Sequence, residues 1–228
     1  MFVNHQRNND LSFSSKYHSS VFMHCKIISS DNFERNQWAG GTTTQLFIYP
    51  LQSEYKKRNF SFRISTATVE LETSQFTKLP GITRKLMVLE GQMKLVHENQ
   101  YTKELTKFEV DSFNGDWNTT SQGKCTDFNL MTIGKSQGEL AALRIEKNKQ
   151  IEYDVKKPSD WLLVYNYIGE VEIYVNDARY TLRAGDLFIG KEMATSKFQF
   201  TGIENSELVI AELWIDSAKK KVSVEYLV

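Results

Sequence analysis

The chain has 228 residues, 40% of them hydrophobic and 12% aromatic, so it can bury a substantial core. Basic and acidic residues number 28 each, and this neutral balance argues against nucleic-acid binding, which needs a basic face. No apolar run approaches the roughly 18 residues of a membrane-spanning helix, and residues 1–20 lack the apolar core of a secretory signal, so we expect a cytoplasmic protein without a membrane partner.

The first half of the chain has the pattern of a β protein. Residues 1–23 are polar and aperiodic, and we interpret them as a mobile leader. In residues 60–65, Phe and Ile alternate with Ser and Arg, and residues 127–131 alternate in the same way. Residues 86–89 and 92–96 read as two strands joined at a glycine. These short strands, with turns between them, indicate a barrel or a sandwich.

The second half repeats the pattern. Residues 161–168 form a β-branched and aromatic run that ends at a glycine, and residues 171–175 alternate. A further strand is predicted over residues 208–215, and residues 222–226 predict a last one. Helical periodicity is weak throughout the chain.

We therefore predict an all-β fold of two small, jelly-roll-like barrels with little helix. Gly, Lys, Ser and Gln interrupt the strand pattern at residues 134–139 and mark the boundary between the barrels. The predicted first barrel spans residues 24–136. The second spans residues 137–228, including the last strand.

The histidines bear on metal binding, because many small β-barrels hold a metal through histidines on inward-facing strands. The chain has four: His5, His18, His24 and His97. Three lie in or beside the leader, and the second predicted barrel contains none. We interpret His97 as a surface-turn residue. No carboxylate cluster has metal-binding spacing, so we expect no metal and no cofactor.

Nucleophilic chemistry has no better support. Cys25 and Cys125 have no histidine nearby in the sequence, and we interpret them as free structural thiols in a reducing cytosol. The chain has no nucleophile-elbow, phosphate-loop or dinucleotide motif. We therefore assign no catalytic residue.

Polar residues on strand faces that should be partly buried are more informative. Arg63 and Ser65 are two apart on a predicted strand, so their side chains point the same way, as do those of Asp127 and Asn129. Arg84 follows a turn and leads into an apolar strand. These side chains are candidates for the interior of the first barrel.

An arginine inside a barrel needs a partner, because an uncompensated buried charge is costly. One interpretation is a structural salt bridge to Asp127 or Asp116. The other is that a guanidinium keeps its fork free to bind the carboxylate of a ligand. The spacing alone favours the salt bridge.

Several motifs that occur in a fixed order over residues 36–132 resemble the HutD/Ves family. They are Trp38–Gln45, Phe60–Val69, Phe76–Arg84, Leu89–Gly91, Phe113–Asp116 and Asp127–Met131. The second half resembles cupins only generally, through Gly169 and residues 184–186. The resemblance implies a bicupin whose pocket lies in the first barrel and whose second barrel is mainly scaffold. It also implies a link to histidine utilisation, in which such proteins are thought to bind an intermediate such as urocanate or formylglutamate.

The resemblance makes a pocket the better interpretation of the polar strand faces. The residues expected to bind the ligand are Thr43, Gln45, Arg63, Ser65, Arg84, Phe113, Asp127 and Asn129. Many relatives have a glutamate at the position of Gln45. The neutral side chain here favours a more anionic ligand.

Three functions follow as hypotheses. The first is a non-catalytic protein that binds a small carboxylate metabolite. The second is a metal-independent enzyme, such as an isomerase of a sugar or organic acid, with Asp116 or Asp127 as the base. The third is a protein-interaction module that uses exposed aromatics such as Trp117 or Tyr153. A homodimer fits all three, because exposed strand edges need cover.

Overall fold

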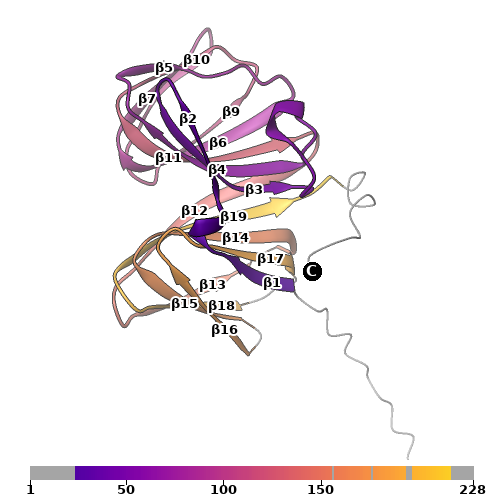
Figure 1. Ribbon diagram of the computed structural model, residues 1–228, viewed down its shortest axis with the longest axis vertical. Coiled ribbons are helices and arrows are strands. Elements are labelled where there is room, and N and C mark those ends of the chain that lie inside the picture. The colour runs from indigo at the N-terminus through magenta and orange to yellow at the C-terminus, as the bar shows by residue number, and fades with distance from the viewer. Residues whose placement is uncertain (1–23, 156, 176, 194–196, 217–228) are drawn as a thin grey trace, which may run out of the picture.

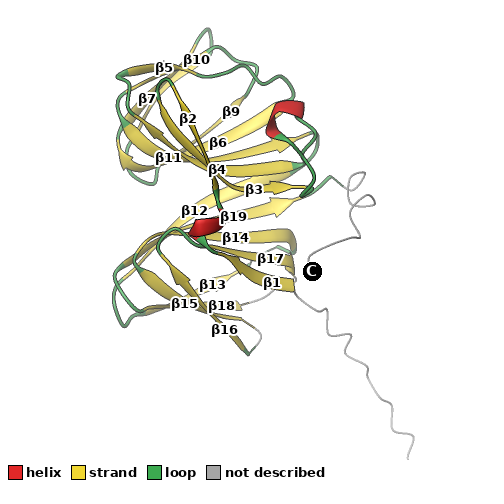
Figure 2. Cartoon of the chain, viewed as in Figure 1, coloured by secondary structure: helices red, strands yellow, loops and turns green. Residues whose placement is uncertain are grey.

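The computed structural model describes residues 24–155, 157–175, 177–193 and 197–216. Almost every element is a β-strand, and the helical elements of the described residues are two 3-10 turns, η1 (Ser30–Asn32) and η2 (Tyr55–Lys57) (Figure 2). The all-β prediction is therefore confirmed. Within these ranges, no helix has the length and hydrophobicity needed to cross a bilayer. The predicted leader and the predicted last strand lie outside the described residues.

The first unit consists of a six-stranded and a four-stranded antiparallel sheet (upper part of Figure 1). In spatial order, the six-stranded sheet contains β2 (Glu34–Trp38), β3 (Gly41–Tyr49), β4 (Phe62–Val69), β11 (Cys125–Ile133), β6 (Ile82–Gly91) and β9 (Val110–Asn114). The four-stranded sheet contains β5 (Thr73–Gln75), β10 (Thr119–Gln122), β7 (Met93–His97) and β8 (Tyr101–Leu105).

The second unit pairs a five-stranded sheet with another four-stranded sheet (lower part of Figure 1). The five-stranded sheet contains β1 (His24–Ile28), β17 (Leu187–Met193), β14 (Ser159–Ile168), β19 (Ser206–Trp214) and β12 (Gln137–Ile145). The four-stranded sheet contains β13 (Gln150–Asp154), β18 (Lys197–Gly202), β15 (Glu170–Val175) and β16 (Ala178–Arg183). Aliphatic and aromatic side chains, including Phe188, Phe198 and Phe200, fill the space between the two sheets.

Strand β1 begins the described chain on the second unit. It pairs antiparallel with β17, with His24 opposite Lys191 and Ile28 opposite Leu187. The chain then passes through η1 into β2 of the first unit (Figure 1). The sequence predicts residues 24–136 as the first barrel, and that division stays a prediction. The strand pairing adds that residues 24–28 complete a sheet of the second unit.

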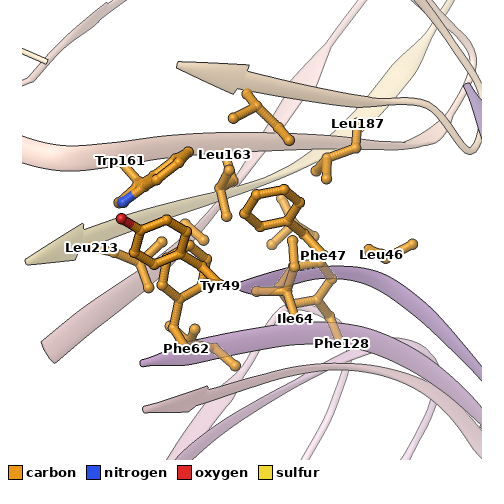
Figure 3. Close-up of a cluster of buried hydrophobic side chains, with 14 of the residues drawn as sticks. Leu46, Phe47, Tyr49, Phe62, Ile64, Phe128, Trp161, Leu163, Leu187 and Leu213 are labelled. Atoms are coloured by element: carbon orange, nitrogen blue, oxygen red, sulfur yellow. The ribbon is translucent and has the colours of Figure 1, made fainter. Parts of the chain in front are cut away.

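The two units share a core, formed where the six-stranded and five-stranded sheets pack face to face (Figure 3). Phe62 from β4 and Phe47 from β3 contact Trp161 of β14, each with ring centroids 5.7 Å apart. Tyr49 stands closer to the same indole, at 4.8 Å. The sheets therefore form a stack, in which the second unit covers one face of the six-stranded sheet.

The opposite face of the six-stranded sheet carries the polar residues of the same strands. Side chains of a strand point alternately to its two faces. Phe62 and Ile64 of β4 lie in the shared core, so Arg63 and Ser65, which alternate with them, point toward the four-stranded sheet of the first unit. The alternation predicted from the sequence is therefore present in the structure.

Candidate functional site

A cavity of about 650 Å³ lies in the first unit, a size that suits a small metabolite. Strands β3, β4, β6 and β11 contribute one wall, and β5 and β10 contribute the facing wall. Glu34 and residues 36–38 of the exposed edge strand β2 also line it, as do residues 53–56 around η2. The site is thus built on the sheet whose other face is fixed by the shared core.

Arg63 is buried in the cavity wall and has neutral partners. Its Nε donates to Oε1 of Gln45 over 2.8 Å, and its Nη1 donates to Oγ of Ser65 over 2.9 Å. The guanidinium also lies over the ring of Tyr55, 4.5 Å from its centroid. Burial lowers the pKa of Arg63. Because Gln45 and Ser65 are neutral, neither hydrogen-bond partner offsets the positive charge of the guanidinium.

Arg84 is 5% exposed and is held in a similar way. Its Nη2 donates to Oδ1 of Asn129 over 2.8 Å. The guanidinium is 4.5 Å from the ring centroid of Phe76 and 5.3 Å from that of Phe113. Burial lowers the pKa of Arg84 to about 10, so this side chain is still a cation at neutral pH. Its Nε has no hydrogen-bond partner among the described residues.

The two arginines stand in one row across the sheet. Arg63 on β4 and Arg84 on β6 both pair with Met131 of the intervening strand β11. Neighbouring strands lie about 4.8 Å apart, so the two backbones are roughly 10 Å apart. Within the described part of the chain, neither guanidinium forms an ion pair with a carboxylate. Two cations therefore line one cavity without a carboxylate bound to either.

Asp127 is 1% exposed and lies on β11 beside these arginines. It accepts a hydrogen bond from the side-chain amide of Asn129, which in turn accepts the bond from Arg84. Burial raises the pKa of Asp127 to about 7, although the nearby charge of Arg84 acts to lower it. This carboxyl therefore titrates near neutral pH.

Most of the residues predicted to bind a ligand lie around this cavity. Those that line it are Thr43, Gln45, Arg63, Ser65, Arg84, Asp127 and Asn129. Phe113 does not line it; the ring is buried and supports Arg84 from behind. Asp116 is exposed and also lies outside the lining, so it is neither a partner of the arginines nor a base for this site. Ligand binding by these residues stays a prediction.

Other lining residues are not found by the sequence reasoning. Tyr55 and Phe76 stack on the arginines, and Ser74 and Ser121 contribute hydroxyls from the facing sheet. Phe76 belongs to one of the family motifs, which is a usable signal. Tyr55 sits in a lysine-rich loop, where nothing in the residue pattern distinguishes it.

The interpretation of His97 as a surface-turn residue is wrong. The side chain is buried, with Nε2 2.8 Å from Oδ2 of Asp111 and Nδ1 2.8 Å from Oγ1 of Thr119. The ring packs on Phe113 and Trp117. His97 is the last residue of β7 and faces inward, so the turn begins one position later than the residue types suggest. It does not line the cavity.

The aromatic residues considered for a partner surface pack within their own units. Trp117 is half-buried against His97 and Tyr101. Tyr153 is half-buried, and its hydroxyl donates to Glu212. Neither ring is a freely exposed anchor.

Comparison with known proteins places this architecture in a family. A family model described as HutD matches residues 30–209. No curated protein matches the chain. Solved structures with the same fold include a conserved protein of unknown function from Pseudomonas aeruginosa PAO1, which is 22% identical with a TM-score of 0.73, the match covering 84% of this chain and 99% of that one.

Two further structures extend the comparison. HutD from Pseudomonas fluorescens SBW25, in a formate condition, is 19% identical with a TM-score of 0.64, and the match covers 85% of this chain and 100% of that one. The oxalate decarboxylase of Lactobacillus farciminis, as a formate complex, is 8% identical with a TM-score of 0.61, and the match covers 83% and 86%. At these identities the likeness shows a shared cupin-like fold.

The lining residues do not fit a metal ion of the kind that many small β-barrels hold through histidines. The cavity lining contains no histidine or cysteine; its carboxylates are Asp127 inside and Glu34 and Glu54, which are exposed. Two guanidiniums occupy the interior. In the described ranges, no group of three or more histidine, cysteine, aspartate or glutamate side chains could hold a metal. This donor set suits an anion instead.

Proposed function

The chain belongs to the HutD family, and from this premise we propose that it is a non-catalytic cytoplasmic protein that binds a small carboxylate metabolite. The cavity of the first unit is the binding site in this proposal. The family suggests a link to histidine utilisation, so urocanate and formylglutamate are the first candidate ligands.

The observation that carries the proposal is the pair of buried guanidiniums with neutral partners. Arg63 is bound by Gln45 and Ser65, and Arg84 by Asn129. Ionised Asp127 offsets one of these two positive charges, and the remaining buried charge is costly. An incoming carboxylate would offset it. The planar guanidinium fork matches a carboxylate in bidentate fashion. The site is therefore suited to an anion with at least one carboxylate.

The remaining walls of the cavity suit the uncharged part of a small organic acid. Tyr55 and Phe76 add aromatic faces, and Ser74 and Ser121 add hydroxyls on the other wall. Formate is a useful minimal probe, because the solved HutD of Pseudomonas fluorescens is described in a formate condition. Comparing the affinities of formate and larger acids would separate the contribution of the carboxylate from that of the rest of the ligand.

The proposal is tested by titration calorimetry of formate, urocanate and formylglutamate into the purified protein, after a thermal-shift screen of the same acids. At least one acid should bind the wild-type protein. Arg63→Met should weaken that binding by about 2–5 kcal/mol, because a buried charge partner is removed. Arg179→Met is the matched control, since Arg179 is exposed on the second unit and pairs with Glu172. Equal affinity in wild type and Arg63→Met would rule out the proposed site.

A second candidate function is acid–base catalysis without a metal. Asp127 favours it, because a buried carboxyl with a pKa of about 7 in a cavity has the properties of a general base. Turnover of a sugar or organic acid by metal-free protein, lost in Asp127→Asn, would support this function. Absence of turnover across a metabolite panel that includes the acids that bind would count against it.

A further inference from the structure

A chain of hydrogen bonds joins the candidate anion site to a buried acid. Arg84 donates to the carbonyl oxygen of the Asn129 side chain, and the amide nitrogen of Asn129 donates to Asp127. The three side chains are 5%, 5% and 1% exposed. Asn129 bonds to both the guanidinium of Arg84 and the carboxyl of Asp127 and so holds them close together. A negative charge that binds to Arg84 therefore changes the pKa of Asp127.

The surroundings leave Arg84 as the main group that stabilises ionised Asp127. On the same sheet, β4 adds Arg63 further along the row, and β11 adds the thiol of Cys125, whose pKa is raised to about 12 by burial. The facing sheet contributes Ser74 and Ser121, whose hydroxyls do not titrate in the physiological range. Further charged residues on the lining are Glu34, Glu54 and Lys56, all exposed.

The interior charges can be counted. Arg63 and Arg84 contribute two positive charges, and ionised Asp127 contributes one negative charge, so the cavity interior carries a net charge of plus one. A monoanion balances this charge. A dianion balances it only when Asp127 is neutral. A second negative charge beside Arg84 also removes the interaction that favours the ionised form of Asp127.

From these contacts we propose that, when the cavity binds a dicarboxylate, Asp127 takes up one proton from solvent. The inference rests on the proposed function and adds the coupling of ligand binding to proton uptake. The step forms one O–H bond on Asp127 and consumes one solvent proton. It makes the interior charge plus two, which matches a dianion.

The test is the pH dependence of binding of N-formyl-L-glutamate, a dianion, and formate, a monoanion, by wild-type protein between pH 6.5 and 8.5. Free Asp127 is mostly ionised above pH 7. The dissociation constant of the dianion should then rise up to about tenfold per pH unit, the slope for uptake of one proton. That of formate should change by less than about threefold across the range. Asp127→Asn should remove the dependence for the dianion.

A second measurement does not depend on a variant. Adding N-formyl-L-glutamate to wild-type protein at pH 8 should create the infrared C=O band of a protonated carboxylic acid, and formate should not. A dianion affinity that is independent of pH in wild type, or an equal dependence in Asp127→Asn, would overturn the coupling while leaving anion binding intact. Failure of N-formyl-L-glutamate to bind at any pH would overturn this inference, and failure of formate and urocanate as well would overturn the proposed function.

Discussion

At the scale of single residues, the site depends on which neutral groups surround two arginines. Gln45 and Ser65 accept hydrogen bonds from Arg63, and Asn129 accepts one from Arg84, without cancelling either charge. The period of two in the sequence correctly predicts that Arg63 and Ser65 share a face. The partner of Arg84 could not be predicted, because Asn129 is 45 residues away and its contact depends on the pairing of β6 with β11.

Asp127 should make the protein less stable as the pH rises from about 4 to 7, the opposite of the usual effect of a carboxyl group. Its folded-state pKa of about 7 lies above its ordinary value of 3.8, so the folded protein binds the extra proton between these limits. The stabilisation is complete below pH 4 and is lost as the pH rises through 7. We expect the free energy of unfolding of wild type, relative to Asp127→Asn, to fall by roughly 1 kcal/mol per pH unit over this window. Urea titrations of both proteins at pH 5 and pH 8 measure it; a pH-independent difference would show that Asp127 stays ionised.

At the scale of elements, glycines at the two ends of β6 allow the backbone conformation that this strand of the site needs. Gly91 ends β6 with φ +77, and a Cβ there would lie 2.5 Å from the carbonyl oxygen of Lys124. Gly81 has the same φ, but nothing lies within 4 Å of its Cβ position. The sequence predicts a turn before Arg84 and a glycine that joins two strands, and Gly81 and Gly91 lie at these places. The sequence does not show that only Gly91 is crowded, because the clash comes from Lys124, which is distant in the sequence.

This pair of glycines gives a matched test. Gly81→Ala should cost about 1 kcal/mol of unfolding free energy, the backbone strain of a left-handed alanine. Gly91→Ala should lower the free energy of unfolding by clearly more, because the added methyl group also collides with the carbonyl oxygen of Lys124. Chemical denaturation of the two variants measures the difference. Equal losses would mean that the pairing of β6 with β11 relaxes around the added methyl group.

At the scale of the whole molecule, the second unit forms the support of the site. Trp161 packs on Phe47, Tyr49 and Phe62 and is 2% exposed, so the sheet with the arginines is covered from behind. The sequence predicts two β units and their strands. It does not predict that they share one core, because apolar strand faces look the same whether they face a barrel interior or another unit.

The shared core predicts that both units unfold together. Trp161→Ala should cost about 3–5 kcal/mol, and Trp38→Ala, at a 40% exposed position, less than about 1 kcal/mol. Amide hydrogen exchange should show that Trp161→Ala lowers protection in β4 and in β14 by the same factor. Loss of protection confined to the second unit would show that the units fold independently.

The central claim is that the first unit holds a carboxylate between its two arginines. The most direct measurement is a crystal structure of the wild-type protein with a saturating concentration of the acid that binds most tightly in solution. The account predicts a carboxylate oxygen within about 3.2 Å of a guanidinium nitrogen of Arg63 or Arg84. An acid bound outside this cavity, or inside it with its carboxylate turned away from both arginines, would contradict the account.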